Sequence, residues 1–250
     1  MTAFDLSGRT ALVTGGATGI GQAIALGLAS LGADLVVLSE RDDTEETVTA
    51  AQRLGRAAEG RVLDLARPEQ IPQVLEAVLA AHQVDVLVNA AGIIRRQPAV
   101  EFSDENWRAV LEVNLTAAFT LSRLVAGPML ARRSGKIINV ASVLSVQGGQ
   151  LVSSYAASKH GLVGLTKAFA NEFAASNVQV NALAPGYIAT RTTEALRNDP
   201  QRSEEILSRV PAGRWGTPDD VWGAAAFLAC PASDYVTGHV LAVDGGWLSR

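Results

Sequence analysis

Short apolar segments alternate with longer segments of helical periodicity along almost the whole chain. The apolar segments have the length, branched side chains and terminal glycines of buried strands. They lie at 10–16, 33–39, 60–65, 84–92, 135–142, 177–186 and 239–246. Helical periodicity covers 19–31, 44–55, 68–82, 104–131, 154–175 and 218–229. Strands that alternate with helices build a parallel sheet with helices on both faces.

The length of 250 residues fits one large α/β domain, so we predict a single domain over 1–250. A closed barrel of eight strand–helix units has a similar length. The glycine pattern after the first strand favours instead an open, doubly wound Rossmann-type sheet of about seven strands. The long irregular connection at roughly 187–217 is predicted to be a lid over a binding site.

Charge and composition exclude several classes of function. The net charge is −4 without a long run of like charges, so we expect neither a nucleic-acid nor a membrane partner. No apolar run looks long enough to span a bilayer, and "MTAFDLSGRT" lacks a signal core. Cys230 is the single cysteine, which suits a reducing cytosol. We therefore expect a cytoplasmic protein. The three histidines show no metal-ligand spacing, so we expect no metal site.

A glycine-rich turn, "TGGATGIG" at 14–21, joins the first strand to the first helix. Gly15 permits a tight turn, Gly19 lets the backbone approach a pyrophosphate, and Gly21 allows close packing of helix and strand. The helix N-terminus offers free N–H groups to phosphates. A plain tight turn is the alternative. The position of this glycine-rich segment between a strand and a helix favours nucleotide binding.

The end of the second strand bears on the choice of cofactor, because an acid there binds the 2′-hydroxyl of NAD and an arginine binds the 2′-phosphate of NADP. The sequence reads Ser39-Glu40-Arg41. Ser39 stands where NAD users often carry Asp, Glu40 would repel a phosphate, and Arg41 could offset that repulsion. We favour NAD and keep NADP open.

Tyr155 and Lys159 lie four residues apart among small side chains in "SSYAASKHG". On a helix this spacing puts both on one face. A neighbouring cation favours the phenolate, so we expect Lys159 to lower the pKa of Tyr155 and make it a proton donor and acceptor. The alternative is an ordinary helix with one tyrosine and an exposed lysine.

Two further polar residues point to the same edge of the sheet. Ser142 ends a predicted strand, where ligands bind in open parallel sheets; it is otherwise a cap or turn serine. Asn114 occupies an inward position of a helical stripe that begins at Trp107 and continues through Leu121 and Val125. A buried amide needs hydrogen bonds, so Asn114 either braces a neighbouring backbone or orders a water beside Lys159.

Together, "TGGATGIG", "NAAG" at 89–92, Asn114, Ser142, "YAASK" and "APGYIAT" resemble the short-chain dehydrogenase/reductase family over nearly the whole chain. The resemblance implies that Tyr155 is the general acid/base, that Ser142 orients the substrate oxygen, and that Asn114 holds a proton-relay water. It implies that Lys159 tunes the tyrosine and holds the nicotinamide ribose. It also assigns cofactor contacts to Gly15, Thr18, Gly19, Ile20, Gly21, Ser39, Glu40, Asp64, Leu65, Asn89, Ala91, Gly92, Ile188 and Thr190. Ala90 departs from the family, which often has asparagine there.

The substrate is suggested by segments such as "NAAGIIRR", "SVLSVQGG" and "SDYVTGHVLAVDGGW", which resemble the 2-deoxy-D-gluconate 3-dehydrogenase branch of this family. That resemblance implies a sugar acid. We expect Arg95 or Arg96 near its carboxylate, since arginine pairs well with carboxylates; an exposed basic loop is the alternative. Gln147 is expected near a hydroxyl, and Trp215 is expected to close over the ring.

Two competing functions stay open at this point. A 3-oxoacyl-[acyl-carrier-protein] reductase would share the catalytic residues, and its basic patch for the carrier could include Arg95 and Arg96. A catalytically silent nucleotide sensor or scaffold would be expected to have lost part of the Tyr/Lys/Ser set, which is intact here. The resemblance also implies a homo-oligomer, commonly a tetramer.

Overall fold

One sheet of seven parallel strands forms the centre of the computed structural model, which describes residues 3–250. Its strand order is β3-β2-β1-β4-β5-β6-β7. The strands are β1 (Thr10–Thr14), β2 (Asp34–Ser39), β3 (Ala58–Val62), β4 (Val84–Asn89), β5 (Gly135–Val140), β6 (Val178–Pro185) and β7 (Val240–Val243). The predicted doubly wound sheet is thus confirmed.

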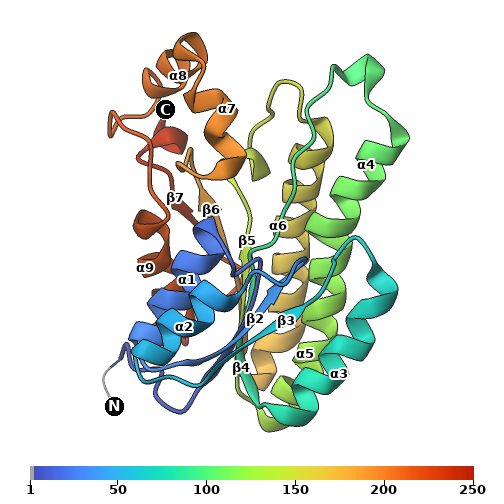
Figure 1. Ribbon diagram of the computed structural model, residues 1–250, viewed down its shortest axis with the longest axis vertical. Helices are drawn as coiled ribbons and strands as arrows, with labels where there is room; N and C mark the ends of the chain where they lie inside the picture. Colours follow the sequence, from blue (N-terminus) through green and yellow to red (C-terminus); the bar gives the residue numbers. More distant parts are fainter. Residues whose placement is uncertain (1–2) are drawn as a thin grey trace.

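Helices cover both faces of this sheet (Figure 1). One face carries α1 (Gly19–Ser30), α2 (Glu45–Arg53) and α9 (Asp219–Ala229); the other carries α3 (Ile71–Ala81), α5 (Ala117–Arg132) and α6 (Ser153–Phe173). A π-helical turn, Glu112–Thr116, joins α4 (Asp104–Leu111) to α5. The helices α7 (Glu194–Arg197) and α8 (Pro200–Leu207) stand above the carboxyl edge of the sheet. Single 3₁₀ turns lie at Pro68–Gln70, Ala99–Glu101, Val143–Ser145, Ala174–Ser176, Arg191–Thr193, Pro231–Ser233 and Trp247–Ser249.

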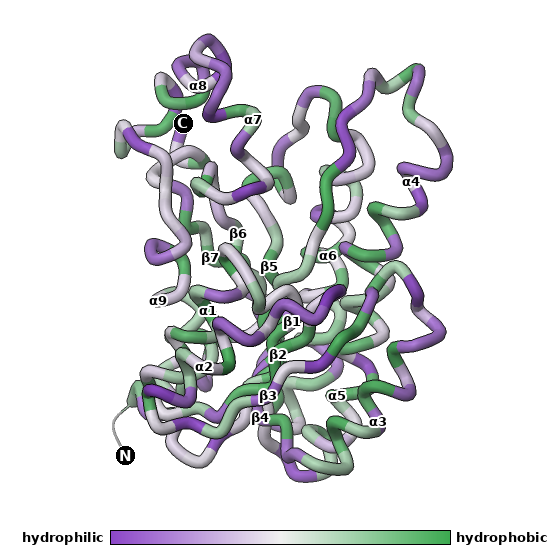
Figure 2. The backbone as a smooth tube through the Cα atoms, in the orientation of Figure 1, coloured by the Kyte–Doolittle hydropathy of each residue, from purple (hydrophilic) through white to green (hydrophobic). Residues whose placement is uncertain are grey.

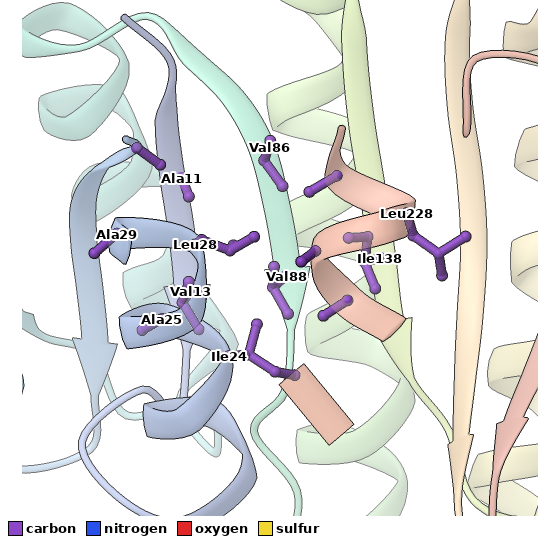
Figure 3. Close-up of a cluster of buried hydrophobic side chains, with 14 of the residues drawn as sticks. Ala11, Val13, Ile24, Ala25, Leu28, Ala29, Val86, Val88, Ile138 and Leu228 are labelled. Carbon is purple, nitrogen blue, oxygen red and sulfur yellow. The ribbon is translucent and has the colours of Figure 1, made fainter. Parts of the chain in front are cut away.

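The central strands are apolar at consecutive positions because both of their faces are buried. In β1, Ala11 and Val13 face α1 and α9, whereas Leu12 faces the opposite helices, and all three are fully buried. Figure 3 shows Ile24 and Leu28 of α1 beside the strand valines. Hydrophobic colouring follows the inner strands and hydrophilic colouring marks α8 (Figure 2).

The strand order reverses between β1 and β4, so the chain leaves these neighbours toward opposite faces. Thr14 ties the two strand ends together, because its Oγ1 accepts hydrogen bonds from the N–H groups of Ala90 (3.0 Å) and Ala91 (3.1 Å). A reversal of this kind opens a crevice at the carboxyl edge, where open α/β sheets bind ligands.

Two predicted elements differ from the structure. The third strand occupies 58–62 instead of 60–65, because β3 is an edge strand whose residues are mostly exposed and carry little apolar pattern. The connection at 187–217 is not irregular throughout, since it contains α7 and α8. Asp199 caps α8 by accepting a hydrogen bond from the N–H of Arg202 (3.1 Å), and Pro200 follows at the first helical position.

The prediction that Trp107 begins an inward-facing stripe of the 104–131 helix is wrong. Trp107 is 39% exposed, whereas Val110, Leu121 and Val125 are fully buried. The π-turn at 112–116 adds a residue to one turn and rotates α4 relative to α5.

The expectation that no segment is long enough to span a bilayer also needs correction. By length and composition, the helical segment Asp104–Arg132 is apolar enough to cross a membrane. Half of its apolar window is buried in the protein, and Leu121, Val125 and Met129 pack beneath the sheet. These contacts make it a core helix of this fold.

Leu87→Ala should lower the free energy of unfolding by about 2–5 kcal/mol, because Leu87 is fully buried in the central strand β4 and its removal leaves a cavity. The matched change Leu54→Ala, at a residue that is 49% exposed, should cost less than about 0.5 kcal/mol. Urea denaturation measures both. An equal loss of unfolding free energy in both variants would contradict the burial of β4 on both faces of the sheet.

Candidate active site

Tyr155 and Lys159 share one face of α6, as their spacing predicts. The ammonium Nζ of Lys159 lies 5.6 Å from the centre of the Tyr155 ring. It donates a hydrogen bond to the carbonyl oxygen of Val140, 2.7 Å away at the end of β5. Lys159 is 3% exposed, so its charge is enclosed and its position is fixed. The alternative of an exposed surface lysine is therefore wrong.

Ser142 follows β5 and lies beside Tyr155. Its Oγ accepts a hydrogen bond from the N–H of Leu144 (3.1 Å), and its own N–H donates to Ser145 Oγ (3.1 Å). It is therefore a capping serine, one of the two roles considered for it. Its hydroxyl lies close enough to the phenol to act on the pKa of Tyr155, which it lowers against the effect of burial. The cap thus holds the second hydroxyl of the site in place.

Asn114 braces the chain that follows β4. Its Oδ1 accepts from the N–H of Ile93 (2.8 Å), and its Nδ2 donates to the carbonyl of Ile93 (3.0 Å) and to Ser158 Oγ (3.1 Å). Ser158 in turn donates to the carbonyl of Tyr155 (2.8 Å). The bracing role is thus observed, and the ordering of a water beside Lys159 stays a prediction.

The electrostatics of Tyr155 differ from the expectation that Lys159 lowers its pKa. Burial raises the pKa of Tyr155 above its ordinary value; the Ser142 hydrogen bond and the charge of Arg96 act in the opposite direction without cancelling this effect. Burial also lowers the pKa of Lys159 to about 8. A lysine that is itself easier to deprotonate is a weaker source of stabilisation for a phenolate.

Four glycines form a strip of bare backbone that leads from α1 to Lys159. A Cβ on Gly15 (φ +64°) would lie 2.9 Å from the Cα of Ala91, and one on Gly21 would lie 2.2 Å from the carbonyl oxygen of Gly15. A Cβ on Gly19 (φ +60°) would lie 3.7 Å from the Cγ2 of Thr190. A Cβ on Gly92 would lie 3.5 Å from the Nζ of Lys159.

This strip fits a dinucleotide. The first turn of α1 holds no acidic residue, and Thr18 makes no side-chain cap, so the helix N–H groups are free for phosphates. Asn89 is buried beside the strip and donates to Ser122 Oγ (3.0 Å) and Asn139 Oδ1 (2.8 Å). Its own Oδ1 has no hydrogen-bond partner among residues 3–250, and a bound group would supply one.

The other predicted cofactor residues surround the same edge. Ser39 donates to Asp43 Oδ1 (2.6 Å), and the exposed Glu40 pairs with Arg41 at 3.2 Å. Asp64 accepts from the N–H of Ala66 (2.9 Å). The remaining residues are Ile20 at the start of α1, Leu65, packed in the core, and Ile188, which bridges to Gly216.

The predicted substrate residues separate into two groups. Arg96 donates to the carbonyl of Thr192 (3.5 Å) and acts on Tyr155, whereas Arg95 contacts only the neighbouring carbonyl of Ile94. Gln147 accepts a hydrogen bond from Trp247 Nε1 (2.7 Å). Trp215 donates to Ser203 Oγ (3.1 Å) and packs edge-on against Tyr187 (5.7 Å), so its indole is part of the α8 packing.

Several residues of the site could not be identified from the sequence pattern. Thr14 and Ser158 hold backbone and amide groups in place, and Tyr187 and Arg209 belong to the 187–217 connection. Thr14 is the first residue of the glycine-rich motif and Ser158 precedes Lys159. The only indication in the sequence that Thr14 and Ser158 belong to the site is that they lie next to the glycine-rich motif and to Lys159.

Lys159→Met should change how stability depends on pH. The folded-state pKa of about 8 lies below the ordinary 10.5, so between these values the unfolded chain binds more protons. The free energy of unfolding of the parent should therefore rise by about 3 kcal/mol relative to that of Lys159→Met as pH increases through this window. Urea denaturation across the window measures this difference. The exposed Lys167→Met should leave the dependence of the parent unchanged; a flat difference for Lys159→Met would contradict the burial of a charged amine.

Comparisons with known proteins agree with this geometry. The family model described as Enoyl-(Acyl carrier protein) reductase matches residues 15–248. The chain is 55% identical to 2-dehydro-3-deoxy-D-gluconate 5-dehydrogenase from Bacillus subtilis (strain 168), over 99% of this chain and 98% of the relative. A solved structure from Beutenbergia cavernae, with bound NADP at low occupancy, has a TM-score of 0.97 and 53% identity and covers 99% and 100% of the two chains.

A second solved relative is the gluconate 5-dehydrogenase from Burkholderia cenocepacia J2315 in complex with NADP and tartrate. It is 42% identical, with a TM-score of 0.94, and the match covers 99% of this chain and 98% of that chain. These matches extend over almost the full length of the chain. The chain therefore belongs to the short-chain dehydrogenase/reductase family, whose members are NAD(P)-dependent oxidoreductases acting on CH–OH groups.

Proposed function

We propose that this protein is an NAD(P)-dependent dehydrogenase that transfers a hydride between a secondary alcohol of a sugar acid and the nicotinamide. The substrate is of the 2-dehydro-3-deoxy-D-gluconate or gluconate type. The observation that carries this proposal is the convergence of Tyr155, Ser142 and Lys159 at the end of the glycine strip. The sugar-acid dehydrogenases among the relatives support the substrate class.

Each residue of the chain has a distinct task in this reaction. A bound nicotinamide supplies the acceptor for the hydride that leaves the alcohol carbon. The phenolate oxygen of Tyr155 takes up the proton of the substrate hydroxyl and becomes the neutral phenol, and Ser142 orients the substrate oxygen by hydrogen bonding. Lys159, fixed on the Val140 carbonyl, keeps a positive charge beside the phenol. Asn114 holds the backbone of Ile93 against α6, so that the strip and the tyrosine keep their separation.

The raised pKa of Tyr155 has a consequence for this mechanism. Burial in the protein alone makes the phenol a weaker acid. We propose that the positive charge of an oxidised nicotinamide adds to those of Lys159 and Arg96 when the cofactor binds. Three cations in a low-dielectric site favour the phenolate more strongly than one does.

Cofactor use follows from the end of β2. The preference for NAD expected from Glu40 finds no support in the solved relatives with bound NADP. We propose that both cofactors bind, because Arg41 pairs with Glu40 and offsets its repulsion of a 2′-phosphate. Both side chains are exposed, so the discrimination is small.

The lid and the assembly are also proposals. We propose that residues 187–217 close over the substrate, since Thr190 faces Gly19 and Arg96 reaches the carbonyl of Thr192. We further propose a cytoplasmic homotetramer. Exposed aromatic side chains support subunit contacts on α4 and α5, where Phe119 is 41% and Trp107 is 39% exposed.

The competing functions are less well supported. In a 3-oxoacyl-carrier reductase, the two neighbouring arginines would form an outward patch, but Arg96 turns toward Tyr155 and the lid. The relative with 55% identity is a sugar-acid dehydrogenase. The presence of Tyr155 beside a capped Ser142 and a Lys159 fixed on the Val140 carbonyl also counts against a silent sensor.

Tyr155→Phe should reduce turnover of a reactive sugar acid by at least about 10³-fold while leaving cofactor binding within about twofold, because only the transferable proton is lost. Steady-state kinetics with a panel of hexonates, ketogluconates and acyl thioesters identifies the substrate. Fluorescence titration with NADH or NADPH measures cofactor binding. Undiminished turnover would reject the role of Tyr155, and a preference for acyl thioesters would reject the sugar-acid assignment.

Glu40→Gln should raise the ratio of kcat/KM with NADP to kcat/KM with NAD by about 3- to 10-fold. Removing an exposed negative charge relieves a repulsion worth about 1 kcal/mol. Asp42→Asn removes a neighbouring exposed charge and serves as the control. An unchanged ratio for Glu40→Gln, or an equal change for both variants, would contradict the place of Glu40 at the ribose.

A further inference from the structure

An aromatic cluster lies between the lid and the end of β6. Tyr187 packs against Trp247, with ring centres 4.7 Å apart, and against Trp215 at 5.7 Å. Trp247 is 4% exposed and its indole N–H is bound by Gln147 (2.7 Å). The cluster is therefore held from the 141–150 loop as well as from the chain terminus.

Arg209, just after α8, lies on this cluster. The central carbon of its guanidinium is 4.0 Å from the centre of the Trp247 ring, a distance at which a cation is attracted to an aromatic face. Stacking of this kind orients the plane of the guanidinium and leaves its N–H groups free at the edge. Arg209 is thus a positioned cation on the lid.

The charge of Arg209 has no acidic partner. Within residues 3–250, no carboxylate lies within 4.0 Å of Arg209 or of Arg96, whereas Arg202 pairs with Glu205 and Arg214 pairs with Asp220. The positive charges of Arg209, Arg202 and Arg96 all oppose the burial that raises the pKa of Tyr187, and of these three only Arg202 is paired with a carboxylate. Two uncompensated guanidiniums therefore share the environment of one phenol.

This environment adjoins the reacting end of the site. Val143, the neighbour of Ser142, is 2% exposed and packs in one apolar cluster with Val210 and Trp247. Arg96 acts on Tyr155 as well as on Tyr187. Arg209 on Trp247 is thus linked through this apolar cluster to the chain that carries Ser142, beside Tyr155.

We propose that Arg209, stacked on Trp247, forms with Arg96 the clamp that binds the substrate carboxylate and selects acids over uncharged polyols. This inference rests on the proposed sugar-acid function and adds to it a residue of the lid. Arg209 follows α8 in the proposed lid, whereas Arg96 follows β4. Closure of the lid would therefore complete the clamp and would depend on the charge of the substrate.

The test compares Arg209→Gln with the parent on a hexonate and on an uncharged polyol that has the same reacting hydroxyl. KM for the hexonate should rise about 10- to 100-fold, the effect of losing a charged hydrogen bond. KM for the polyol should stay within about twofold, and kcat should change less than KM for both. Arg191→Gln removes an exposed lid cation and should change neither KM. Arg209→Lys should rescue the hexonate KM only in part, since lysine lacks the planar guanidinium.

An equal rise in KM for acid and polyol would overturn the clamp, because it would indicate a structural role of Arg209 on Trp247. An unchanged hexonate KM would overturn it as well. If the parent oxidises no sugar acid, the proposed function fails separately. Calorimetric binding of D-gluconate to the parent and to Arg209→Gln, each saturated with NADP, then tests the clamp: about 10-fold weaker binding to the variant supports it, and equal binding or none to the parent rejects it.

Discussion

The hydrogen bond from Lys159 to the carbonyl of Val140 is the interaction on which the site depends. It places a buried ammonium at the end of β5 and fixes α6 against the sheet, which sets the position of Tyr155 one turn away. The cost is visible in the lysine itself, because burial lowers its pKa to about 8. The protein thus keeps an unfavourable buried charge beside the tyrosine that we propose as the acid/base, a common trade-off between stability and activity.

Short polar contacts hold the neighbouring loops around this point. Thr14 joins the ends of β1 and β4, and Asn114 joins the chain after β4 to α6. A buried series continues through Asn89 and Asn139 to Thr166 on α6. These contacts tie the glycine strip and the Tyr155 face of α6 into one frame. The 187–217 connection with Arg209 is the part that we propose closes over a substrate.

Much of this arrangement could be predicted from the sequence, for identifiable reasons. Strands buried on both faces have continuous apolar runs, and Tyr155 and Lys159 fall on one face because a helix fixes that geometry. The bounds of the edge strand β3 were predicted wrongly because it carries little of this pattern. Trp107 was wrongly predicted to face inward because a π-turn has no clear periodic signature. The raised pKa of Tyr155 and the stacking of Arg209 depend on neighbours remote in the chain, which no local spacing reveals.

The central claim is that the protein alone makes Tyr155 a weaker acid, so that a bound oxidised cofactor must contribute to its activation. Ultraviolet difference titration of the parent against Tyr155→Phe isolates the ionisation of this phenol from those of Tyr187 and Tyr235. Without cofactor, Tyr155 should titrate above the ordinary value of 10.0, and saturation with NAD or NADP should move its pKa downward. A pKa below 10.0 in the free enzyme would contradict the account, as would a pKa that the oxidised cofactor leaves unchanged.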